Sequence, residues 1–254
     1  MLVPESNIIE LMGPPGVGKS TLYHEVCKKW SPDSNWVYFD MLMASPTPSI
    51  RNFSNWLAYR YKKYTGKRLH GTLSLDYGLT FVKEHKELAN FCWQLFTEDP
   101  IRHPIEQRYR NIYLLFDHFS GYQAIASRQY SKPCLVEEGL FQKSFLVYDD
   151  KQRMAAILDE YCELVPLPKA VVAIYTDDVD LIVKQIKHRK KIIASHQNKD
   201  HEGLMKDTKK WLLFTQLVLE KLQSKGVHTI CIDGSKSLQE KAIDLQSVLK
   251  SLPR

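Results

Sequence analysis

The stretch NIIELMGPPGVGKSTLYHEV, residues 7–26, contains an apolar run, a loop rich in glycine and proline, and a helical pattern. Its first half is a short apolar run that is typical of a buried strand, and Lys19 to Lys29 has the pattern of a helix. Between them, Gly13 to Ser20 fits the pattern G-x-x-x-x-G-K-[ST], and a strand before it and a helix after it are the context that this motif requires. Glycines let backbone N–H groups converge on phosphate oxygens, and the helix N-terminus adds partial positive charge. The stretch therefore predicts a loop that holds the phosphates of a nucleoside triphosphate.

The loop supplies most of the nucleotide contacts that we expect. These residues are Gly13, Pro14, Pro15, Gly16, Val17, Gly18, Lys19, Ser20 and Thr21. Lys19 should reach the β- and γ-phosphates, the Ser20 hydroxyl should bind Mg²⁺, and Thr21 should touch the α-phosphate. The expected cofactors are ATP and Mg²⁺. A Gly-Pro turn that only caps a helix is the alternative, but it leaves the lysine and the serine unexplained.

The rest of the chain alternates between short apolar runs and helical patterns. Further strands are predicted at 35–41, 132–139, 169–178 and 227–234. Helices are predicted at 179–194, 203–225 and 237–252, and the region 49–131 has helical spacing without a clear strand. Strands separated by helices indicate a parallel sheet covered on both faces. We therefore expect an α/β fold of the P-loop NTPase type, a single domain over residues 1–254. It should have a five-stranded, mostly parallel sheet and a helical insert between strands two and three.

Carboxylates follow two of the predicted strands, at the edge of the sheet where ligands bind in such folds. Asp40 ends the second strand, and Glu137 and Glu138 end the third. A P-loop site needs a carboxylate from a neighbouring strand to hold Mg²⁺. Glu137 is our first choice for this metal ligand and Glu138 our second, because adjacent residues at a strand end point to opposite sides. A surface glutamate pair at a turn remains the alternative.

A basic segment follows the fourth strand. Lys184, Lys187, Arg189, Lys190 and Lys191 cluster there and lead into a polar stretch. Positive charge on the moving phosphoryl group accelerates its transfer, and a closing lid can deliver it. We therefore expect a lid over 184–203, with Arg189 as its catalytic residue because a guanidinium group can bind two oxygens at once. For the lysines, an exposed basic helix face is an equal alternative.

The composition indicates an ordinary soluble chain. Hydrophobic residues make up 44% of the 254 residues, and no apolar run approaches the ~20 residues that span a bilayer. The N-terminus lacks the features of a signal peptide. The five cysteines are scattered and form no CxxC pair, which argues against a disulfide scaffold or a zinc site. We expect a cytoplasmic protein without a membrane segment.

The net charge of +6 is concentrated in one segment. Met41 to Leu75 contains no carboxylate but carries Arg51, Arg60, Lys62, Lys63, Lys67 and Arg68. Such a segment raises the local concentration of an anionic partner. It equally fits a solvated helix face.

In several places the chain resembles P-loop kinases of small molecules, the thymidylate kinase and deoxynucleoside kinase group. The resemblance rests on GPPGVGKST, on Asp40, on LVEEGLFQ, on VDLIVKQIKHRKK and on the C-terminal VHTICIDGSKSLQEKAIDLQSVL. It implies a phosphotransferase in which Asp40 accepts the proton of a hydroxyl or binds the substrate. It also implies that Arg128 and Glu138 contact the acceptor and that Gly234 and Ser235 lie near adenine. The arginine that usually follows the acid of strand three is Glu138 here, and Lys184 stands where an arginine is common.

Three functions remain open from the sequence. The first is a kinase that phosphorylates a nucleoside, nucleotide or sugar, with an acceptor that already carries phosphate favoured by the basic segment. Its pocket could draw on aromatic residues of the insert, although core packing is the favoured explanation for most of them: Trp56, Tyr59, Tyr61 and Trp93. The second is an ATPase that acts through partners, in which Glu138 activates water and Thr176 reads the γ-phosphate. The third and least favoured is nucleic-acid binding through WLAYRYKKYTGKR, residues 56–68. The sequence leaves the oligomeric state open, and a dimer is compatible with it.

Overall fold

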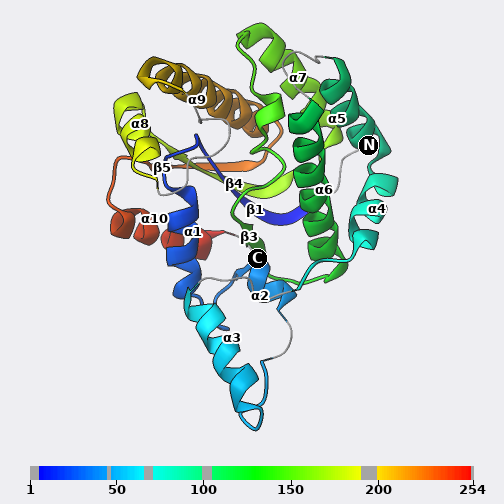
Figure 1. Ribbon diagram of the computed structural model, residues 1–254, viewed down its shortest axis with the longest axis vertical. Helices are drawn as coiled ribbons and strands as arrows, with labels where there is room; N and C mark the ends of the chain where they lie inside the picture. Colours follow the sequence, from blue (N-terminus) through cyan, green and yellow to red (C-terminus); the bar gives the residue numbers. More distant parts are fainter. Residues whose placement is uncertain (1–5, 45–46, 66–70, 99–104, 190–198, 253–254) are drawn as a thin grey trace.

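The computed structural model of the protein describes residues 6–44, 47–65, 71–98, 105–189 and 199–252. Its centre is a five-stranded sheet in the order β2-β3-β1-β4-β5, in which every pairing is parallel. The strands are β1 (Ser6–Met12), β2 (Val37–Tyr38), β3 (Cys134–Val136), β4 (Pro168–Tyr175) and β5 (His228–Asp233). The predicted α/β architecture with a five-stranded sheet is confirmed, and the sheet is parallel throughout (Figure 1).

Strand β1 lies in the middle of the sheet, and its side chains divide the interior into two cores. Ile9 and Leu11 face a core that is completed by α1 (Lys19–Lys28) and α10 (Leu238–Ser251). Ile8 and Met12 face the opposite and larger core. This alternation follows from the two-residue repeat of a strand. Because both faces are covered, the strand is apolar almost throughout, and this is why a sequence pattern could find it.

The larger core is covered by most of the remaining helices. They are α4 (Leu75–Glu84), α5 (Lys86–Glu98), α6 (Ile105–Ser127), α7 (Lys151–Leu164) and α9 (His201–Ser224). Shorter elements are α2 (Phe39–Met43), α8 (Val179–Lys187) and a 3₁₀ turn at Ser144–Leu146. The prediction that 49–131 is helical and lies between strands two and three is confirmed for its described residues.

The strand order places a topological switch point between β1 and β4. The chain leaves β1 toward β2, on one side of the sheet, and leaves β4 toward β5, on the other side. Ligands of open α/β sheets bind at such a reversal, beyond the carboxyl ends of the strands. Gly13 follows β1 there and packs tightly on β4: a Cβ on Gly13 would lie 2.3 Å from the Ile174 carbonyl oxygen. The sequence motif is therefore located at the switch point of the sheet.

Two predicted strands are shorter than expected. Strand β2 ends at Tyr38, and Asp40 lies in the first turn of α2 rather than at a strand end. Strand β3 ends at Val136, so that Glu137 and Glu138 belong to the bend that follows. After β2 the apolar residue Phe39 follows the last backbone pairing, so hydrophobicity alone does not show where β2 stops, whereas in β3 the apolar run and the pairing both end at Val136.

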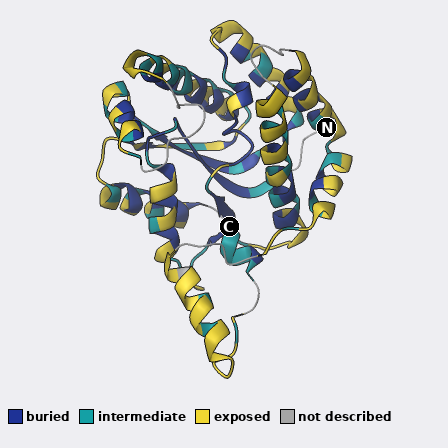
Figure 2. Cartoon of the chain, viewed as in Figure 1, coloured by how far each residue is buried: buried dark blue, intermediate teal, exposed yellow. Residues whose placement is uncertain are grey.

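Helix α3 (Phe53–Thr65) extends away from the body of the protein (Figure 1). Most of its surface is exposed (Figure 2), including the large side chains of Phe53, Leu57, Tyr61 and Tyr64. No helix in the described ranges combines the length and the apolar character that a membrane crossing requires. All five cysteines are free.

Candidate functional site

The loop between β1 and α1 has the backbone geometry that its glycines predict. Gly13, Gly16 and Gly18 adopt φ angles of 142°, 103° and 97°, a region that side chains other than glycine rarely enter. Gly18 is the N-cap of α1, and no side chain among the described residues caps that helix. The first N–H groups of α1 are therefore left for another acceptor. A phosphate group is the natural partner of such a helix end.

Lys19 is buried beneath this loop, with 6% of its surface exposed. Its Nζ donates hydrogen bonds to the carbonyl oxygens of Gly13, at 2.8 Å, and of Pro14, at 3.2 Å. Burial lowers the pKa of Lys19 to about 8, Glu138 and Glu137 oppose that shift, and Arg189 adds to it. Within the described part of the chain, no carboxylate forms an ion pair with Lys19. A buried ammonium without a carboxylate at its side is suited to an anionic ligand.

Helix α8 packs directly on the loop and brings Arg189 to it. A Cβ on Gly16 would lie 2.6 Å from Ile186 Cγ1 and 3.1 Å from Ile182 Cγ2, so only glycine fits beneath this helix. Arg189 follows the last turn of α8, where its N–H donates to the Ile186 carbonyl oxygen. The sequence-predicted residues Lys19 and Arg189 are thus brought together in one site. The remainder of the predicted lid, 190–198, lies outside the described residues.

A buried carboxylate that the sequence did not reveal as functional holds the loop after β3. Glu10, in the middle of β1, is fully buried. Its carboxylate accepts hydrogen bonds from the Tyr122 hydroxyl, from Leu140 N–H at 3.1 Å and from Phe141 N–H at 3.2 Å. Burial raises the pKa of Glu10, while these hydrogen bonds and the charge of Lys143 act in the opposite direction. The segment after β3 is therefore attached to the central strand.

Gln142 forms a second attachment between the same two segments. Its Oε1 accepts a hydrogen bond of 3.0 Å from Gly13 N–H, the first residue of the phosphate loop. On the other side, the Tyr161 hydroxyl of α7 donates to the Leu140 carbonyl oxygen at 2.8 Å. The turn that carries Glu138, Gln142 and Lys143 is thus held from several sides.

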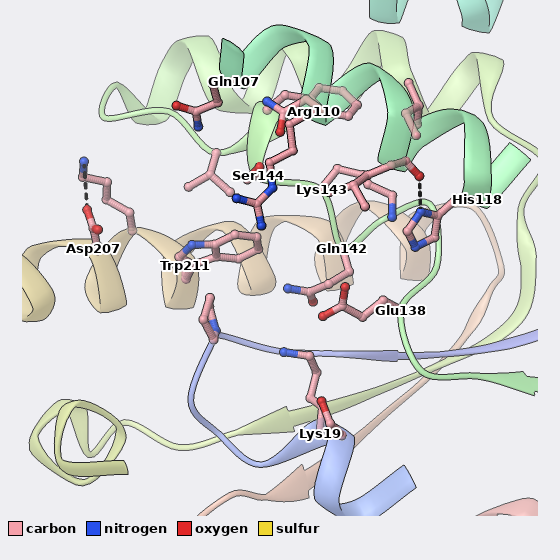
Figure 3. Close-up of a pocket in the computed structure, with 18 of the residues that line it drawn as sticks. Lys19, Gln107, Arg110, His118, Glu138, Gln142, Lys143, Ser144, Asp207 and Trp211 are labelled. Atoms are coloured by element: carbon pink, nitrogen blue, oxygen red, sulfur yellow. Dashed lines mark hydrogen bonds and ion pairs between the residues drawn. The ribbon is translucent and has the colours of Figure 1, made fainter. Parts of the chain in front are cut away.

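A cavity of about 680 Å³ opens between the phosphate loop, this turn, α6 and α9. Figure 3 shows Lys19 on one side of the cavity, Arg110 and Lys143 on the opposite side, and Gln142 and Glu138 between them. The Trp211 indole of α9 and Leu114 of α6 add apolar wall. Ser20 also lines the cavity. The volume suits a small-molecule ligand.

The charged residues of the cavity are mostly cationic. They are Lys19, Arg110, Lys143, Arg189 and Lys210, against Glu106, Glu138 and Asp207. Lys210 and Asp207 have partners nearby: Lys210 Nζ lies 2.6 Å from Asp149 and 3.6 Å from Asp207, and Lys199 also pairs with Asp207. The remaining lysines and arginines outnumber the remaining carboxylates, so an anionic ligand is favoured.

Of the two glutamates after β3, Glu138 lines the cavity and Glu137 is not among the lining residues. Both lie within electrostatic range of Lys19, and the influence of Glu138 on its pKa is the larger. The structure therefore favours our second choice for the carboxylate next to the phosphates. The Ser20 hydroxyl and the Glu138 carboxylate are oxygen donors of the kind that Mg²⁺ binds together with substrate phosphates and water. The site thus fits this cofactor.

The predicted adenine residues lie beside the phosphate loop. A Cβ on Gly234 would be 2.8 Å from Val17 Cγ2, so the loop after β5 contacts the loop after β1. Ser235 donates to Asp233 through both its N–H and its hydroxyl. Lys241 of α10 was missed by the sequence: its buried Nζ donates to the Gly234 carbonyl oxygen at 3.1 Å and lies 3.8 Å from where a Gly18 Cβ would be.

Several predicted residues do not reach the cavity. Asp40 is absent from its lining. It instead raises the pKa of the buried Cys134 thiol through its charge, after the larger effect of burial. Arg128 is exposed beyond the C-terminal end of α6, roughly 15 Å along the helix from His118, the last lining residue of that helix. The aromatic residues expected to wall the pocket are also elsewhere, namely Trp56, Tyr59, Tyr61 and Trp93, and their place is taken by Trp211 and Phe145.

No protein-family model matches the chain, and no curated protein matches it at a significant level.

Proposed function

We propose that this protein is an ATP-dependent phosphotransferase with the P-loop NTPase fold, which moves the γ-phosphate to a small molecule bound in the cavity. One observation carries the proposal. The lysine of the phosphate-loop motif, a carboxylate and an arginine from three separate segments line the same 680 Å³ cavity, namely Lys19, Glu138 and Arg189. A hydrolase needs room for water only, whereas this cavity has room for an acceptor.

Each residue has a role in this proposal. The backbone N–H groups of the loop and Lys19 bind the triphosphate, and Arg189 stabilises the negative charge that develops on the phosphoryl group during transfer. Glu138 accepts the proton of the attacking hydroxyl or helps to hold the metal ion. Ser20 and Glu138 would hold Mg²⁺ together with the triphosphate, and the metal ion would supply positive charge that offsets the charge of the phosphates. Gly234, Ser235 and Lys241 border the nucleoside end of the triphosphate.

The cavity wall supplies the acceptor side. Glu106 to His118 of α6 and the turn from Glu138 to Val147 provide most of it, so the helical insert contributes one long element to this site. The deep part of the cavity is lined by Lys19, Gln142 and Lys143, whose side chains are nearly buried. A bound acceptor that displaced water from this part would favour transfer over hydrolysis.

The decisive experiment is a screen of nucleosides, nucleotides and sugars for acceptor-dependent release of ADP. We expect at least one acceptor to raise ADP release well above the rate with ATP alone, and Lys19→Ala to abolish both rates. Binding of a fluorescent ATP analogue provides the control. If the protein binds ATP but no acceptor changes its turnover, the phosphotransferase proposal is wrong.

An ATPase that acts through a partner is the second candidate, and one observation favours it. Helix α3 exposes aromatic side chains together with Arg60 and Lys62, and Arg51 is exposed just before it; none of these residues lines the cavity. Such a surface suits an acidic partner or single-stranded nucleic acid. Fast ATP hydrolysis without an acceptor would support this candidate. Absence of a gel shift with nucleic acid at low salt would remove its nucleic-acid form.

A further inference from the structure

Lys143 is the most unusual charged residue of the cavity that the proposed transfer does not use. Only 7% of its surface is exposed, and it lines the cavity. In the part of the chain that the structure describes, its ammonium group has no hydrogen bond and no ion pair. Burying a lysine without such a partner is costly. The cost is understandable if a ligand supplies the partner.

The carboxylates around Lys143 do not fill this role. Glu138 and Glu10 influence its pKa, which burial lowers to about 8, yet neither forms an ion pair with it. Glu10 is already occupied by the Tyr122 hydroxyl and by two backbone N–H groups. Asp117 also acts on Lys143 only from a distance. The imidazole of His118, which also lines the cavity, is neutral because burial and the charge of Lys143 lower its pKa to about 3. Its Nδ1–H donates to the Leu114 carbonyl oxygen at 2.6 Å.

Arg110 and Ser144 provide further hydrogen-bond donors on the same side of the cavity. Arg110 reaches into the cavity from α6, and Ser144 follows Lys143 in the chain with an exposed side chain (Figure 3). Arginine, lysine and a hydroxyl together suit a group with several oxygens, such as a phosphate or a carboxylate. Gln142 and Glu138 lie between these donors and Lys19.

This arrangement separates two anion sites within one cavity. Lys19 and the loop glycines serve the triphosphate, on the side of β1. Lys143 and Arg110 lie on the opposite side, so a different negative group must occupy them if the triphosphate is in its loop. The acceptor is the molecule that the proposed reaction places there.

We propose that Lys143 and Arg110 form a subsite for an anionic group of the acceptor, a phosphate or a carboxylate, at the end away from the atom that receives the phosphoryl group. The inference rests on the proposed phosphotransferase function for the identity of the acceptor. The substrate class is a small molecule with a negative group at one end and a reacting hydroxyl or phosphate at the other.

Binding can be tested without transfer. Inorganic phosphate is titrated into the protein saturated with a non-hydrolysable ATP analogue, with tryptophan fluorescence as the readout. Because the chain has five tryptophans, the Trp211→Phe variant identifies the part of the signal that comes from the cavity wall. We expect saturable quenching. The apparent Kd for phosphate should be roughly tenfold or more higher in Lys143→Met, which is the loss typical of one charge-assisted hydrogen bond, and Lys143→Arg should largely restore the affinity. Lys151→Met, at an exposed position at the start of α7, is the matched control and should behave as the unsubstituted protein. Equal quenching in Lys143→Met would overturn the subsite.

Turnover then identifies the anion. Acceptors are compared in pairs: a sugar with its phosphate, a nucleoside with its monophosphate, and a polyol with the corresponding hydroxy acid. We expect the anionic member of a pair to be used, with KM raised roughly tenfold in Lys143→Met and binding of the ATP analogue unchanged. Equal turnover of the neutral and the anionic acceptor of a pair would refute the subsite but not the proposed phosphotransferase function. Phosphate binding that depends on Lys143, without any transfer, would instead refute the proposed function alone.

Discussion

Asp40 and Glu138 are the two carboxylates that could serve the proposed transfer. Asp40 is the position that the family resemblance suggested, but it lies in the first turn of α2 and does not line the cavity, whereas Glu138 lines it together with Lys19. Under the proposed function, Glu138 is therefore the better candidate.

We predict that Glu138→Gln lowers acceptor-dependent turnover by a factor of roughly 10² or more, as for the loss of a general base or a metal ligand. Asp40→Asn should keep turnover within about threefold of the unsubstituted rate, because a residue outside the reacting geometry contributes little transition-state stabilisation. Steady-state kinetics with a saturating acceptor checks both variants. The assignment of roles would be reversed by an inactive Asp40→Asn protein that still binds ATP.

At the scale of elements, the turn after β3 is shaped by contact with β1. A Cβ on Gly139 would lie 1.8 Å from the Glu10 carboxyl carbon and 2.1 Å from its Oε2. Residue 139 must therefore be glycine for the turn to approach the strand and donate its N–H groups to Glu10. The turn carries Glu138 and Gln142, so this one close approach sets the position of both.

We predict that Gly139→Ala destabilises the protein by roughly 2–4 kcal/mol, because the methyl group displaces a buried, hydrogen-bonded carboxylate. Gly121→Ala is the control, since its added Cβ would meet Phe39 at an ordinary 3.6 Å. It lies in α6, where alanine is favoured over glycine, and should be neutral or slightly stabilising. Urea unfolding measures both variants. Equal unfolding midpoints for the two variants would show that the turn can move away from β1.

The sequence predicted the parts of the site that are local, and it missed the parts that depend on tertiary packing. Lys19, Ser20 and the loop glycines belong to one continuous motif with a strand and a helix around it. Arg189 was found because it ends a basic helix. Glu10 reads as an isolated polar residue in a strand, and its partner Tyr122 lies more than 100 positions away. No local sequence pattern marks Lys143 or Trp211 as a residue of the site.

The same limit explains the errors in the fold. Strand β2 was predicted to run to Met41 because the apolar residues do, but Phe39 already begins α2. Trp56, Tyr59, Tyr61 and Trp93 were considered for the wall of a pocket because they are aromatic residues of the insert. Tertiary contacts decide whether such a helix packs or projects, and α3 projects.

For the molecule as a whole, two buried lysines make the free energy of unfolding depend on pH. Lys19 and Lys143 each have a pKa lowered to about 8 by burial, against 10.5 for an ordinary lysine. Between these values the unfolded chain binds more protons than the folded chain, so the free energy of unfolding rises with pH. Below pH 8 both states are protonated, and the penalty of burial is fully present.

We predict that the ligand-free protein gains about 1 kcal/mol of stability for each of these lysines when the pH is raised from about 7.5 to 9. Above that range the gain should reverse, because burial raises the pKa of Cys92 and Cys162 to about 12 and the unfolded thiols ionise first. Urea unfolding at several pH values measures the effect, and the Lys19→Met and Lys143→Met variants should each remove its share. A free energy of unfolding that does not change over this pH interval would contradict the lowered pKa values of Lys19 and Lys143.

The hydrogen bonds that Glu10 and Gln142 form with the turn after β3 and with Gly13 limit which ligands can bind across the cavity. Glu10 and Gln142 attach this turn to β1 and to Gly13. The distance between Lys19 on one side of the cavity and Lys143 on the other is therefore set by the fold. The cavity should therefore select ligands by the distance between their two anionic groups. Molecules that link a triphosphate to a second anion should bind best at one tether length, with affinity falling steeply for shorter and longer tethers.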